Sequence, residues 1–184
     1  MKTLWGSLVQ PHIDYCSQLW TPHRVGDIQK IESLFRSFSN KIYSISDLNY
    51  WDRLSALKMY SQERRMERYR ILYIWKILEG IAPNVGIQSY TSTRQGRLCR
   101  VPQIKLCSTG AIRTIREGSL QIRGPQLFNS LPVNIRGLTG CSVITFKRKL
   151  DKHLQSIPDK PKIPGYTIET DTNSITSMRS SRES

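Results

Sequence analysis

The sequence lacks the features of a membrane, zinc-finger or disulfide-rich protein. No apolar run approaches the roughly 20 residues that a membrane-spanning helix needs. There are only three histidines and no Cys-x-x-Cys pair, so we expect no metal site. The cysteines are few, widely spaced and not preceded by a signal-peptide pattern, which favours reduced thiols in a soluble intracellular protein that does not associate with membranes. They are Cys16, Cys99, Cys107 and Cys141.

Acidic residues are also scarce. The 184 residues include 14 acidic and 28 basic side chains, which gives a formal charge of +14 at pH 7. The surplus is uneven, since 17 basic and 5 acidic side chains lie between Ser61 and Ile157. Such a composition favours a polyanionic partner over a small metabolite.

Helical periodicity dominates the first part of the chain. An amphipathic pattern that begins at Leu4 is interrupted at Pro11, which predicts two short helices or one kinked helix. Asp27 is expected to cap a second helix that runs to Ile42 and carries one apolar stripe. The stripe consists of Ile28, Ile31, Leu34, Phe35, Phe38 and Ile42.

Two further helices are expected before residue 81. The first is short and covers Trp51–Leu57. The second is the longest in the chain, because Ser61 is a suitable N-cap and Gly80 a suitable stop. Aromatic residues in it, Tyr69, Tyr73 and Trp75, are expected to pack in the core rather than to stack on bases.

The pattern changes after residue 81. The segment 82–110 is rich in Gly, Pro, Ser and Thr and predicts a flexible linker. Weak alternation around Glu117–Gly118 predicts a small hairpin over 111–123, and Ser142–Leu154 predicts a basic amphipathic helix. The segment after Ile157 has too little apolar surface to fold and is expected to be disordered. The expected regions are 1–81, helical; 82–110, linker; 111–157, a small basic module; and 158–184, a disordered tail.

Several phrases of the sequence carry a resemblance to a known family. Residues 120–132 read Leu-x-x-Arg-Gly-Pro-x-Leu-Phe-Asn-Ser-Leu-Pro, followed by the cationic run at 145–150. Residues 8–15 read Leu-Val-x-Pro-x-Ile-x-Tyr, and Arg64-Arg65 precede Tyr69-Arg70 and Tyr73. In order and spacing, these phrases resemble the region downstream of the polymerase core in the reverse transcriptases of jockey-like non-LTR (LINE) retrotransposons.

The resemblance implies a fold and a parent activity. It predicts a mainly α protein, with a helical thumb-like bundle followed by a small α+β basic module and a disordered tail. The parent would be an RNA-directed DNA polymerase, of which this chain is a C-terminal fragment. Its partners would be RNA and RNA–DNA hybrid, together with the palm and fingers domains of that polymerase, and the resemblance implies work in the nucleus. Phe128 departs from the tryptophan, and Gln10 from the basic residue, that are commoner in the family.

Catalytic residues are not expected in this chain. Polymerase chemistry needs carboxylates that hold two metal ions about 3.5–4 Å apart, which the family supplies partly from a Tyr-x-Asp-Asp turn. No two aspartates are adjacent here, and Tyr50-Trp51-Asp52-Arg53 is not such a turn. The chain alone is therefore predicted to be inactive and to hold no cofactor, whereas Mg²⁺ would belong to the intact parent polymerase.

Basic side chains are the candidates for nucleic-acid contact. Arginines of the longest helix are placed to follow a phosphate backbone, but also to pair with Glu63 and Glu67 on a solvated face. The cluster within 147–152 is denser, with only Asp151 to offset it. Asn129 is expected to bond local backbone rather than to read a base. The candidate residues are Arg64, Arg65, Arg68, Arg70, Arg123, Lys147, Arg148, Lys149 and Lys152.

Two other functions fit the same sequence. The apolar helices suit a stand-alone protein-interaction domain in which the charge only maintains solubility. The chain also fits a decayed element copy without function. A selected domain is expected to unfold cooperatively, whereas a fragment separated from a larger enzyme is expected to be aggregation-prone or partly molten.

Overall fold

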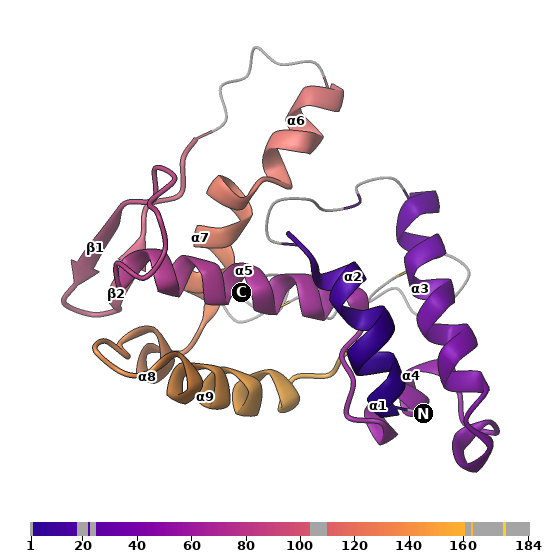
Figure 1. The fold of residues 1–184 in the computed structure, drawn as a ribbon. Coiled ribbons are helices and arrows are strands. Elements are labelled where there is room, and N and C mark those ends of the chain that lie inside the picture. Colours follow the sequence, from indigo (N-terminus) through magenta and orange to yellow (C-terminus); the bar gives the residue numbers. More distant parts are fainter. Residues whose placement is uncertain are drawn as a thin grey trace. The chain divides into compact units, whose positions relative to one another are not determined.

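The computed structural model describes residues 2–17, 22, 25–103, 110–160, 163 and 175 (Figure 1). The described part is mainly helical, with one small antiparallel sheet, as the sequence predicts. No helix in this part is long and apolar enough to cross a membrane. The chain divides into two compact units, and the border falls inside the helix α5 (Gln62–Leu78). Unit 1 comprises Met1–Met66 with Asp159–Ser174, and unit 2 comprises Glu67–Pro158 with Ile175–Ser184.

Unit 1 is built from short helical segments and one longer helix. The start of the chain is one helical run on both sides of Pro11, and the segment before the proline, Trp5–Val9, is π-helical, an irregularity of the kind found where helices depart from regular geometry. Trp5 packs edge-on against Phe35, at 5.1 Å between ring centroids, and stacks on Phe38 at 4.4 Å. The elements are α1 (Lys2–Leu4), the π-helical η1 (Trp5–Val9), α2 (Gln10–Asp14), α3 (Val25–Asn40), the 3₁₀-helical η2 (Tyr43–Ile45), α4 (Tyr50–Ala56) and the start of α5.

Some of the helix ends lie where the sequence predicts them and others do not. Ser61 caps α5 as predicted, because its hydroxyl accepts a hydrogen bond from the amide of Arg64 at 3.2 Å. Gly80 follows the last turn of that helix with a positive φ of 71°, a conformation that glycine adopts at no steric cost. The prediction for Asp27 is wrong, because α3 begins at Val25 and Asp27 lies in its first turn, where a carboxylate favours the helix dipole. Leu34 was expected in the core but is about half exposed.

Unit 2 surrounds the second part of α5. The indole of Trp75 is fully buried, stacks on Phe146 at 4.4 Å and donates a hydrogen bond to the carbonyl of Leu138 at 2.9 Å. The other elements are β1 (Ser89–Ser92), β2 (Gly96–Cys99), α6 (Gly110–Glu117), α7 (Leu120–Ser130), α8 (Val133–Arg136) and α9 (Val143–Gln155). The expectation of a core position for Trp75 is thereby confirmed.

The strands do not lie where the sequence predicts them. The predicted hairpin at 111–123 is wrong, since α6 and the start of α7 occupy that segment. Ile112 and Ile115 are three residues apart, a spacing that suits a helix face as well as weak alternation. The sheet instead lies inside 82–110, where β1 pairs with β2 and Gly96 adopts a φ of 67° at the turn. The predicted linker thus contains regular structure, and the described part of 111–157 consists of helices and the short connections between them.

The C-terminal segment is described at few positions. Most of the predicted disordered tail, 158–184, lies outside the described residues. Within it, Asp159 accepts hydrogen bonds from the amide of Ser61 at 2.7 Å and from its hydroxyl at 2.6 Å. Ile163 is buried with the core of unit 1. At these two positions the segment is therefore part of the folded unit.

Candidate nucleic-acid interface

The helix α9 has one buried face and one charged face. Phe146, Leu150 and Leu154 recur at four-residue steps and are almost completely buried. Ser142 caps the helix, because its hydroxyl accepts a hydrogen bond from the amide of Thr145 at 3.2 Å. The opposite side carries the cationic face of α9, whose side chains are all exposed. It consists of Lys147, Arg148, Lys149 and Lys152.

The single acidic residue of α9 is paired with an arginine of α5. The guanidinium of Arg68 donates a hydrogen bond from Nε to Oδ1 of Asp151 at 2.5 Å and a second from Nη2 to Oδ2 at 2.8 Å. Such a two-point pair between a planar guanidinium and a carboxylate is the strong form of this interaction. Because Arg68 already neutralises Asp151, the carboxylate does little to offset the cationic face of α9.

The other arginines of α5 are buried or half-buried and are engaged with other residues of their own unit. In unit 1, Arg64 is 2% exposed and lies 3.9 Å from a carboxylate oxygen of Asp159. Arg65 donates to a carboxylate oxygen of Asp14 at 3.3 Å. Burial raises the pKa of Asp159, while hydrogen bonds from Ser61 and the charges of Arg64 and Arg65 oppose that rise. These two arginines therefore contribute to packing within unit 1.

In unit 2, Arg70 is buried and Arg123 is half-buried. Arg70 is 5% exposed and donates to the backbone carbonyl of Gly118 at 2.8 Å. Burial, aided by the nearby charge of Arg123, lowers the pKa of Arg70 to about 10, so it remains charged at neutral pH. Arg123 lies 3.6 Å from the buried carboxylate of Glu67. Of the candidate residues, the exposed ones are thus the four on α9.

Residues 120–132, which carry the Arg-Gly-Pro phrase, contribute to the core of unit 2. Leu127 and Phe128 are fully buried, and a Cβ atom added at Gly124 would meet side-chain atoms of Ile74 at 2.8 Å. The side-chain amide of Asn129 accepts a hydrogen bond from the backbone N–H of Cys99 at 2.8 Å and donates one to the backbone carbonyl of the same residue at 2.8 Å. Asn129 therefore bonds backbone, as expected, but that of β2 rather than of a local segment.

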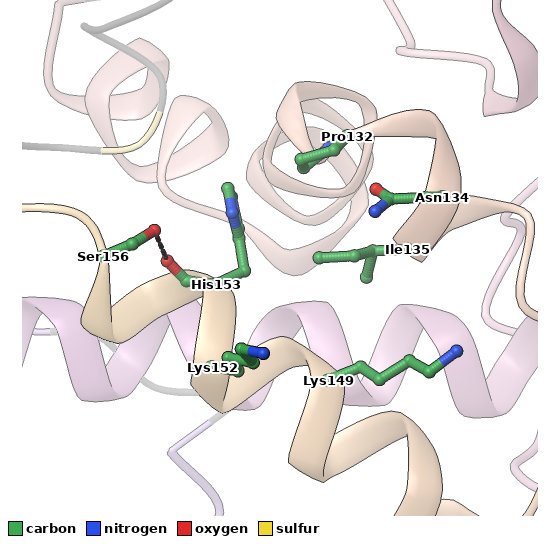
Figure 2. A pocket seen from close by; sticks show the side chains of 7 residues that line it. All are labelled: Pro132, Asn134, Ile135, Lys149, Lys152, His153 and Ser156. Carbon is green, nitrogen blue, oxygen red and sulfur yellow. Dashed lines mark hydrogen bonds between the residues drawn. The ribbon is translucent and has the colours of Figure 1, made fainter.

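Beside the cationic face lies a hollow of about 510 Å³ between α8 and α9 (Figure 2). Lys149 and Lys152 line it from α9 together with His153, a residue that the sequence did not single out. Pro132 and Ile135 line it from the segment around α8. The spacing of Lys149 and His153, four residues apart on a helix, was the only signal in the sequence that could have placed them on one side.

The described residues offer no metal centre. Nowhere in the described part of the chain do three or more His, Cys, Asp or Glu side chains come together in a group that could hold a metal ion. Burial raises the pKa of the Cys99 thiol to about 11, although Arg97 and Arg136 oppose the rise, so this cysteine is a protonated, inert core residue.

Comparison with known proteins gives no relative. No protein-family model, no curated protein and no solved structure matches the chain.

Proposed function

We propose that this chain is the nucleic-acid-binding C-terminal region of a retrotransposon reverse transcriptase. In this role the cationic face of α9 holds the phosphate backbone of RNA or of an RNA–DNA hybrid. The chain supplies binding, while a palm domain elsewhere in the polymerase supplies the metal-dependent chemistry. The thumb-like role of the helices rests on the resemblance of the sequence phrases to that family.

The observation that carries the proposal is the cationic face of α9. Four exposed basic side chains lie within six residues, and the carboxylate that α9 itself carries, Asp151, is held by Arg68. The buried stripe on the other side of α9 fixes the helix, since Phe146 stacks on Trp75. A group of cations on a helix that is held in place attracts phosphates without regard to sequence.

The proposal is tested by titrating the purified chain with a fluorescent RNA–DNA hybrid at several salt concentrations. We expect binding at low salt that weakens steeply as salt rises, because bound counterions are released from the phosphates. Replacing Lys147, Arg148, Lys149 and Lys152 by glutamine should weaken binding and reduce the salt slope by roughly one unit for each phosphate that the variant no longer neutralises.

A matched control variant distinguishes the position of the basic residues from their total charge as the cause of weaker binding. Lys30, Lys41, Lys58 and Arg94 are exposed basic residues outside α9, and their replacement by glutamine removes the same charge. This control should bind nearly as well as the unaltered chain. Absence of binding at low salt, binding indifferent to salt, or equal weakening in both variants would each refute the proposal.

A further inference from the structure

We infer that the hollow between α8 and α9 binds one unpaired nucleotide, with its phosphate at Lys149 and Lys152 and its base between His153 and Ile135. This inference rests on the proposed function and narrows it, because it names single-stranded nucleic acid as the ligand of this site. A hollow of about 510 Å³ lies within the roughly 300–1,000 Å³ that small-molecule pockets occupy.

The cationic side of the hollow suits a phosphate. Lys149 and Lys152 are three residues apart on α9, so their side chains leave the same side of the helix. Both are exposed, and each ammonium group offers three donors for phosphate oxygens. The other two members of the cationic face, Lys147 and Arg148, do not line the hollow. Substitutions at Lys147 and Arg148 can therefore test phosphate contact outside the hollow without altering the residues that line it.

Two further residues that line the hollow suit a base. Figure 2 shows the imidazole ring of His153 and the side chain of Ile135 flanking the hollow. Ile135 is 5% exposed, and its amide donates to the carbonyl of Pro132 at 3.0 Å, so this wall is held in place. The aromatic ring of His153 accommodates a splayed base by stacking, while the small exposed part of Ile135 borders the hollow on the other side.

The end of α9 sets the direction of the nucleotide. The last carbonyls of a helix carry partial negative charge, which disfavours a phosphate there. The carbonyl of His153 accepts from the hydroxyl of Ser156 at 2.7 Å, and this pair lines the same end of the hollow. The phosphate is therefore favoured toward Lys149, because Lys152 already lies in the last turn of α9 and contributes its charge from beside that end. The base, whose amino groups can donate hydrogen bonds, is favoured at the end near Ser156.

A second hollow in unit 2 differs in the charge of the residues that line it. It has about 410 Å³ and is lined by Arg123, but also by Glu117. Its acidic residue offsets the arginine, whereas the described residues that line the hollow between α8 and α9 include no acidic side chain. Of these two hollows, the one between α8 and α9 combines net positive charge with a stacking wall.

The test compares two labelled single-stranded RNA oligonucleotides of equal length, one of them abasic throughout, in titrations with the full chain. The oligonucleotide with bases should bind at least about five-fold more tightly, the factor that roughly 1 kcal/mol of stacking provides. His153→Ala should remove most of this preference, and His153→Phe should restore it by replacing one aromatic ring with another. The double variant K147Q/R148Q is the control outside the hollow, and it should weaken both oligonucleotides by the same factor.

The outcomes separate this inference from the proposed function. Equal affinity for both oligonucleotides, with salt-dependent binding of the hybrid intact, overturns the nucleotide site and leaves the proposed function standing. A base preference that survives His153→Ala also overturns it. Failure of every nucleic acid to bind at low salt refutes the proposed function itself.

Discussion

The basic residues of this protein fall into two groups according to where their charge is satisfied. The guanidinium groups of Arg64 and Arg70 are almost fully buried, and each lies against a carboxylate or a backbone carbonyl. Removing a partner from such a group leaves a buried charge unpaired, which is strongly unfavourable. The side chains of Lys147 and Arg148 are exposed and remain available to an external anion. Residues of the same formal charge therefore contribute to packing in one place, while in another they carry the binding that we propose.

Glu32 is a buried carboxyl in unit 1. Its side chain accepts a hydrogen bond from the hydroxyl of Tyr50, and the amide of Gln62 lies 3.4 Å from Oε2. Burial raises the pKa of Glu32 to about 7; these two hydrogen bonds oppose the rise, and the charges of Asp159 and Glu63 add to it. The folded protein therefore holds this proton more tightly than the unfolded chain.

This difference predicts how stability depends on pH. The unfolded chain releases the Glu32 proton near pH 4.5 and the folded protein near pH 7, so the contribution of Glu32 to stability falls as pH rises between these values. The loss is on the order of 3 kcal/mol in all. Glu32→Gln stays neutral and should flatten this fall, as measured by urea unfolding at pH 5, 6, 7 and 8. Asp27→Asn, which alters an exposed carboxyl of the same helix, should leave the slope of the unfolding free energy against pH unchanged. Equal slopes for Glu32→Gln and the unaltered chain would contradict the prediction.

At the scale of elements, α5 and α7 approach closely at one glycine. A Cβ atom at Gly124 would lie 2.8 Å from both Cγ1 and Cδ1 of Ile74, which is completely buried. Leu120 of α7 adds a third neighbour at 3.3 Å. The glycine of the Arg-Gly-Pro phrase is thus explained by helix packing in unit 2.

Gly124→Ala should destabilise the protein. Overpacking of a filled core costs about 1–3 kcal/mol, which outweighs the gain of up to about 1 kcal/mol that alanine brings to a helix. Gly110→Ala is the control, because no side chain or remote backbone among the described residues lies within 4 Å of the corresponding position at the start of α6. Urea unfolding of both variants measures the difference. A Gly124→Ala variant as stable as Gly110→Ala would show that Ile74 moves aside at little cost.

At the scale of the whole molecule, the charge of +14 opposes folding through self-repulsion. Ion pairs such as Arg68–Asp151 oppose this repulsion, and they are partly buried and therefore weakly screened by salt. Repulsion between exposed cations is screened strongly. The two contributions consequently respond differently to ionic strength.

The thermal midpoint should therefore rise as sodium chloride increases from low to physiological concentration. Circular dichroism at 222 nm, recorded during heating at 10, 50 and 150 mM salt, measures it. The variant that lacks the cationic face of α9 should show a smaller rise, because it has four fewer charges to screen. A midpoint that falls with salt would mean that surface ion pairs, rather than self-repulsion, dominate.

The sequence by itself determined the helical character, several helix ends and the surplus of positive charge. These features depend on neighbouring residues, such as Ser61 and Gly80 at the two ends of α5, and so they can be predicted locally. The tertiary structure alone decided which cations remain exposed and where the strands pair. Arg64 is buried because Asp159, remote in sequence, lies beside it, and Asn129 is held by the backbone of Cys99. Contacts between residues so far apart in the sequence leave no periodic pattern, and for this reason composition and spacing could not reveal them.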